Sequence, residues 1–131
     1  MIEIVGTWAL VRATATAADG RVLAPPFGGE TAMGRVTFNA DGRMMAVLCD
    51  GRPSLPGGAK RGYTSYCGNY TFNGRQLVTR VDAYSDPARM GTDQVRDVSF
   101  EGKLMVLRPP LKAYAQEPEQ RTLWWERVAA V

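Results

Sequence analysis

Short apolar or alternating segments separated by tight-turn dipeptides run along this chain and restrict it to an all-β fold. The turn dipeptides are Asp19-Gly20, Asp41-Gly42, Asp50-Gly51, Asn73-Gly74 and Glu101-Gly102. Asn-Gly and Asp-Gly tolerate the positive φ angles that two-residue hairpin turns require, so they join neighbouring antiparallel strands. The segments between these turns predict eight strands, at residues 5–15, 32–39, 43–49, 64–72, 75–84, 92–100, 103–108 and 120–128.

Eight antiparallel strands at this spacing predict an up-and-down barrel or a β-sandwich. No stretch of ten or more residues carries a clean helical period, and only residues 85–91 predict one helical turn. Asp86 would cap that turn, Pro87 would occupy its first position and Gly91 would end it. The length of 131 residues suits one domain, residues 1–131.

The absence of histidine excludes several classes of chemistry. Ser-His-Asp and Cys-His nucleophile pairs need an imidazole, and two cysteines alone cannot complete a structural zinc site. The net charge of +3 comes from arginines scattered singly along the chain, without the basic stripe that follows a phosphate backbone. We therefore predict no metal, no cofactor and no nucleic-acid partner.

The chain start and the two cysteines bear on the cellular compartment. Residues 1–6 lack the basic and long apolar regions of a signal peptide, and no apolar run approaches the ~20 residues of a membrane span. These features predict a cytoplasmic protein without a membrane partner. Cys49 and Cys67 fall in adjacent predicted strands on one outward face, where a disulfide is geometrically possible but disfavoured by a reducing compartment.

A series of short motifs gives the chain a resemblance to one family. They are Gly6-Thr7-Trp8; Pro26-Phe27-Gly28; Gly34 with Phe38 and Asp41-Gly42; Tyr66-Cys67-Gly68-Asn69-Tyr70; Pro87 with Gly91-Thr92 and Arg96; and Leu123-Trp124-Trp125-Glu126-Arg127. In this order they resemble the bacterial and fungal lipocalin-like domain family, within the calycin group. Relatives often carry a histidine on the strand where this chain has Thr79-Arg80, so activities that need it are not carried over.

The resemblance implies an all-β, eight-stranded antiparallel up-and-down barrel. It also implies that Trp8 plugs the closed end of this barrel and that Arg127, from the last strand, lies across the indole. The physical reason is that a large ring fills the taper of a barrel, and a guanidinium on its face adds about 0.5–2 kcal/mol as a cation–π contact.

Alternation along the strands predicts which side chains face the barrel interior. If Trp8 faces inward, so do Leu10, Arg12 and Thr14 on the same strand. The predicted ligand-binding residues are Arg12, Phe38, Met44, Tyr66, Tyr70, Thr79, Gln94, Arg96 and Trp125. Apolar walls with a few polar groups are typical of small-molecule sites. Each inward arginine either meets an acidic or phenolic ligand group or is paired with a protein carboxylate.

Two functions fit this interior. The first is binding of an apolar or aromatic small molecule, with an acidic group as one option. The alternative is a cofactor-independent isomerase, cyclase or lyase acting on an aromatic or polyketide-like molecule, for which Tyr66, Tyr70 and Arg96 are catalytic candidates, with Asp82 a weaker one. Outward Val, Leu and Trp124 leave open either a homodimer surface or ordinary apolar exposure.

Overall fold

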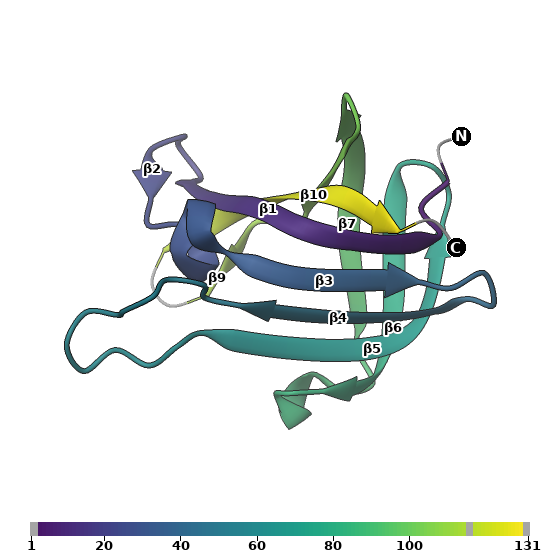
Figure 1. Cartoon of the computed structure of the whole chain (residues 1–131), viewed down its shortest axis with the longest axis horizontal. Coiled ribbons are helices and arrows are strands. Elements are labelled where there is room, and N and C mark those ends of the chain that lie inside the picture. The colour runs from purple at the N-terminus through teal and green to yellow at the C-terminus, as the bar shows by residue number, and fades with distance from the viewer. Residues whose placement is uncertain (1–2, 115–116, 130–131) are drawn as a thin grey trace.

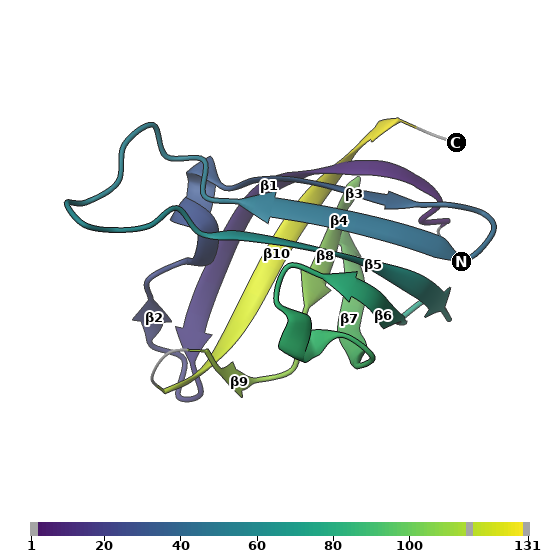
Figure 2. The same ribbon diagram turned by 90° about the horizontal axis from the view of Figure 1, so that it is seen from below.

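In the computed structural model, which describes residues 3–114 and 117–129, eight antiparallel strands close into a barrel (Figure 1). Going around the barrel, they are β1 (Gly6–Ala17), β3 (Met33–Phe38), β4 (Arg43–Cys49), β5 (Tyr63–Phe72), β6 (Gln76–Tyr84), β7 (Asp93–Glu101), β8 (Leu104–Arg108) and β10 (Pro118–Ala129). β1 pairs with β10 and completes the circle (Figure 2). All eight predicted strands are confirmed, with ends displaced by a few residues.

Four short elements lie at one end of the barrel. They are β2 (Val22–Leu23), the 3-10 turns η1 (Pro26–Thr31) and η2 (Pro87–Arg89), and β9 (Lys112–Ala113). The η2 turn confirms the helical turn predicted for residues 85–91, because the Asp86 carboxylate caps it by accepting the Ala88 N–H. We call the end of the barrel where these four elements lie the open end. No helix within the described residues is long and apolar enough to cross a bilayer.

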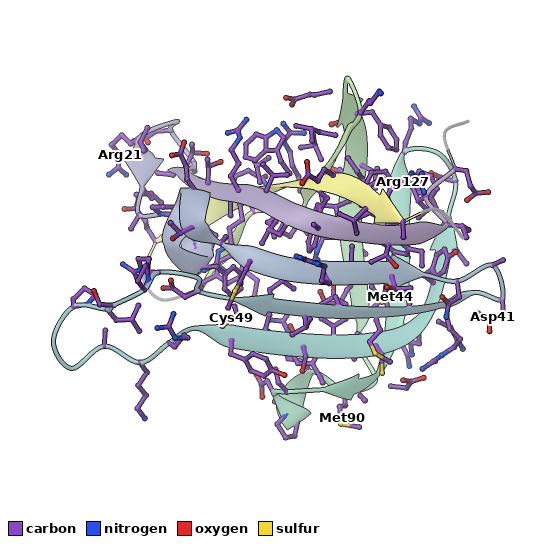
Figure 3. The ribbon with its side chains drawn as sticks, viewed as in Figure 1. Arg21, Asp41, Met44, Cys49, Met90 and Arg127 are labelled. Atoms are coloured by element: carbon purple, nitrogen blue, oxygen red, sulfur yellow. The ribbon has the colours of Figure 1, made fainter. Side chains whose placement is uncertain are left out.

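The opposite, closed end is filled by the indole plug, which we define as Trp8 with Arg127. The Trp8 side chain is buried and its Nε1–H donates to the Ile4 carbonyl at 2.9 Å. The Arg127 guanidinium lies 4.3 Å from the indole centroid and donates to the carbonyls of Val5 and Glu3. The structure therefore brings together the two residues that the family resemblance paired; Figure 3 shows Arg127 at this end.

A β-bulge in β1 corrects the predicted orientation of Arg12. The pairing with β10 shifts register between Leu10 and Arg12, so the side-chain alternation reverses there. Beyond the bulge Ala13 and Ala15 are buried, and the prediction that Arg12 and Thr14 face inward is wrong. The Arg12 guanidinium instead covers the outer face of the barrel, 3.7 Å from the Trp124 ring centroid.

A second bulge lies between β5 and β6 and depends on Gly68. The register shifts between Cys67 and Gly68, and Asp82 is the extra residue on β6. The backbones approach so closely that a Cβ on Gly68 would lie 2.0 Å from the Arg80 carbonyl oxygen. The extra residue reverses the side-chain alternation of β6 and brings Tyr84 opposite Tyr66. Both rings therefore lie on the barrel wall toward the open end.

Replacing Gly68 by Ala should lower the free energy of unfolding by about 1–3 kcal/mol, because the added methyl forces the two strands apart. Gly57→Ala is the matched control, since nothing lies within 4 Å of a Cβ built there. Urea denaturation of both variants measures the difference. Equal stability of Gly68→Ala and the parent would show that the bulge does not need glycine.

The two cysteines do not meet. Both are free thiols, and the register pairs Cys49 with Tyr63 but Cys67 with Met45, four residues further along the strand. A rise of about 3.3 Å per residue puts them well beyond the Cα separation of a disulfide. The expectation that a bridge is geometrically possible is therefore wrong.

Candidate functional site

A cavity of about 470 Å³ opens at the open end of the barrel, and we call it the mouth cavity. Its walls come from the open-end halves of β4, β5, β6, β7, β8 and β10, and its rim from η1, η2 and the segment 109–114. This volume is within the range of small-molecule sites, roughly 300–1,000 Å³. The apolar part of the lining is contributed by Phe27, Leu48, Leu107, Leu111, Leu123 and Trp125, together with the prolines of the rim.

Gln94 and Arg96, two residues apart on β7, share the face that lines the cavity. Arg96 donates one Nη hydrogen bond to the Val95 carbonyl and another to the Gln94 side-chain oxygen. The Gln94 amide nitrogen is then left as a donor; it is buried and has no partner among the described residues. A guanidinium has five N–H donors, so Arg96 keeps donor capacity for a further acceptor.

Trp125, on β10, supplies a second unpartnered donor. The side chain is only 2% exposed and lines the cavity, and its indole Nε1–H has no acceptor among the residues the structure describes. An unpaired buried donor costs about 1–3 kcal/mol, which an acceptor atom would recover. Gln94, Arg96 and Trp125 together make the cavity wall rich in donors and short of acceptors.

Positive charge dominates the cavity. Arg89 of η2, Arg96 of β7, Lys112 of β9 and Arg121 of β10 all line it, whereas Asp93 is the one carboxylate in the described lining. Asp93 is paired with Arg80, and Arg121 is paired with Glu119 at 2.6 Å. Arg89, Arg96 and Lys112 form no ion pair among the described residues, so their charge attracts anions to this end.

Tyr66 and Tyr84 form a flat aromatic wall. Their rings stack at 5.3 Å between centroids and 12° between planes, and Arg89 lies over Tyr84. Burial raises the pKa of the Tyr66 phenol, against the opposing effect of the positive charge of Arg96. Tyr66 therefore remains a neutral hydroxyl at neutral pH, able to donate a hydrogen bond into the cavity.

The Pro-Phe-Gly motif places one rim residue. Phe27 lines the cavity with φ of 56°, a left-handed conformation that costs a non-glycine residue about 1–2 kcal/mol. Beside it, the Gly28 backbone approaches the Asp50 carboxylate so closely that a Cβ would lie 2.7 Å from Oδ1. Hydrogen bonds from Arg52 lower the pKa of buried Asp50, so this carboxylate beside Gly28 stays ionised at neutral pH.

Two long Gly- and Pro-rich segments of the chain, residues 23–31 and 50–62, differ in their relation to the mouth cavity. Residues 23–31 contribute Phe27, whereas none of residues 50–62 lines the mouth cavity. Arg61 donates to the carbonyls of Asp50 and Arg52 and closes the base of its own loop. Figure 1 shows this loop extending away from the barrel between β4 and β5.

Of the predicted ligand-binding residues, the structure gathers Tyr66, Gln94, Arg96 and Trp125 around the mouth cavity. Phe38, Met44, Tyr70 and Thr79 do not line it. Phe38, Met44 and Tyr70 pack toward the closed end, where Tyr70 meets Phe38 edge to face and donates to the Asn39 carbonyl at 2.8 Å. Thr79 is buried between its strand partners Tyr70 and Gln94. For these eight residues alternation identified the inward face of the strand, but not the height along the barrel at which packing ends.

The predicted catalytic residues also divide between the mouth cavity and other parts of the barrel. Tyr66 and Arg96 line the cavity, Tyr70 is held at the closed end, and Asp82 pairs with Arg43 on the outer surface. Sequence reasoning missed Tyr84, Arg89, Lys112, Tyr114 and Arg121. The glycine inside the Tyr66–Tyr70 segment was the one available signal for Tyr84, because a glycine within a strand often marks a bulge.

Comparison with known proteins agrees with the motifs. A family model described as a lipocalin-like domain matches residues 5–128, nearly the whole chain. No curated protein matches the sequence.

Proposed function

Because the chain belongs to the lipocalin-like domain family, we propose that its barrel binds a small aromatic or apolar molecule bearing an acidic group. The acidic group accepts hydrogen bonds from Arg96, the Gln94 amide and the Trp125 indole. The flat, apolar part of the molecule lies against Tyr66 and Tyr84. The observation that carries this proposal is a pair of buried donors, next to an arginine, for which the described part of the chain supplies neither an acceptor nor a carboxylate partner.

Binding is favoured over the enzymatic alternative by the same lining. An isomerase, cyclase or lyase needs a base as well as an acid. Tyr66 supplies a neutral hydroxyl and Arg96 could stabilise an enolate, but Asp93, the one lining carboxylate in the described residues, is paired with Arg80. The cavity therefore offers mainly donors and positive charge, which retain an anion, and the one carboxylate in its described lining is held by an arginine.

Calorimetric titration with three naphthalenes of similar size tests the proposal. We expect 2-naphthoate to bind at least about tenfold more tightly than 2-naphthalenemethanol, because hydrogen bonds to charged groups contribute about 1.5–3 kcal/mol each. The cation 2-naphthylmethylamine should bind most weakly. Native mass spectrometry of freshly purified protein would show whether an acidic molecule is retained. Equal affinity for the acid and the amine, or no binding of any of the three, would overturn the proposal.

A further inference from the structure

Lys112 is a lysine at the rim whose side chain lines the mouth cavity. It belongs to the two-residue strand β9, which pairs with the start of β10. The ammonium lies 5.3 Å from the Tyr114 ring centroid. The chain has two other lysines, Lys60 and Lys103, and neither lines this cavity.

The charges around Lys112 disfavour its protonated form. Arg89 from η2, Arg96 from β7 and Arg121 from β10 all oppose a further positive charge. The carboxylate of Glu119, the cross-strand neighbour of Lys112, is held by Arg121. Burial, reinforced by the three arginines and opposed in part by Tyr84, lowers the pKa of Lys112. A lower pKa leaves a larger share of the Lys112 side chain as the neutral amine than an ordinary lysine has, and a neutral amine next to a ligand cavity is a nucleophile toward carbonyl carbon.

We propose that Lys112 forms a Schiff base with an aldehyde or ketone group of the bound ligand. The amine nitrogen attacks the carbonyl carbon, its two hydrogens leave with the carbonyl oxygen as water, and a C=N bond remains. No oxidant or further reactant is needed. This inference rests on the proposed function, because the acidic group held by Arg96 directs the other end of the ligand to the rim.

Reductive trapping tests the inference. The protein is incubated at neutral pH with 6-formyl-2-naphthoate and cyanoborohydride, and the label is located by peptide mass mapping. Because binding raises the local concentration of the aldehyde, we expect label at Lys112 to exceed that at Lys60 or Lys103 by about tenfold or more. The non-carbonyl analogue 6-methyl-2-naphthoate should compete at Lys112 and leave the other two lysines unaffected.

Two variants separate reactivity from binding. Lys112→Arg keeps the positive charge without a primary amine, so it should lose the label and still bind 6-methyl-2-naphthoate. Lys103→Arg, in the turn between β7 and β8, should leave labelling of Lys112 unchanged. Similar labelling of all three lysines, or labelling of Lys112 that the competitor does not reduce, would overturn the inference alone. Failure of 6-methyl-2-naphthoate to bind would overturn the proposed function as well.

Discussion

Arg96→Met should weaken the binding of 2-naphthoate by about 30- to 100-fold, which corresponds to about 2–3 kcal/mol. Methionine preserves the apolar stem of the side chain but removes the charge and the spare N–H donors. The change also releases the Gln94 side-chain oxygen, which Arg96 now holds. Gln94 could then rotate its amide, and the wall would lose the fixed donor arrangement that we propose as the acid-binding site.

Arg35→Met is the matched control for this prediction. Arg35 lies on the outer surface of β3, outside the mouth cavity, and its guanidinium donates to the preceding carbonyl, as that of Arg96 does. Calorimetry of both variants should give an unchanged dissociation constant for Arg35→Met. An equally tight complex with Arg96→Met would show that the acidic group lies elsewhere. Binding of 2-naphthalenemethanol should change little in either variant.

The fold could be predicted because the residues that form the hairpin turns can be recognised from the sequence of each turn alone. Asn73-Gly74 connects β5 and β6, and the Asn73 carboxamide accepts the N–H groups of Arg75 and Gln76. Such a turn fixes where one strand ends and the next begins without any knowledge of the rest of the molecule. The indole plug was predictable for a different reason, since the resemblance paired Trp8 with Arg127 across almost the whole chain.

The site was only partly predictable because bulges reverse the alternation. Arg12 lies just beyond the first bulge and faces outward, opposite to the prediction, and the second bulge turns Tyr84 toward the mouth cavity. A single extra residue moves every later side chain to the other face of the strand. Gly68 carried a signal for one bulge, but nothing in the Leu10–Arg12 segment marks the other.

The rim could not be predicted from strand patterns at all. Lys112, Tyr114 and Arg121 meet only because β9 folds back onto β10, where Arg121 lies 3.6 Å from the Tyr114 ring centroid. The proline-rich segment 109–119 predicts a loop and no pairing. Long connections often carry function in compact domains, and here the connection supplies Lys112 and Tyr114 to the mouth cavity.

Trp8→Ala should lower the free energy of unfolding by about 3–5 kcal/mol, because it removes a buried indole and leaves a cavity at the closed end. Trp8 is 2% exposed and belongs to the main core cluster with Phe38 and Met44. Its loss also leaves the Ile4 carbonyl without the indole donor and Arg127 without the ring beneath it. A loss of this size is a large part of the 5–15 kcal/mol of a typical domain.

A double-mutant cycle with Arg127→Met isolates the contact between the two plug residues. The cost of Arg127→Met should be about 0.5–2 kcal/mol smaller in the Trp8→Ala background than in the parent, because the cation–π contact is already gone while the hydrogen bonds to Val5 and Glu3 remain. Urea denaturation gives the four free energies, with Trp8→Phe as a milder variant that retains an aromatic ring. The mouth cavity is at the opposite end of the barrel, so the folded Trp8→Phe protein should bind 2-naphthoate with unchanged affinity. Additive costs for Trp8 and Arg127, or a Trp8→Ala cost below about 1 kcal/mol, would show that the closed end does not depend on this plug.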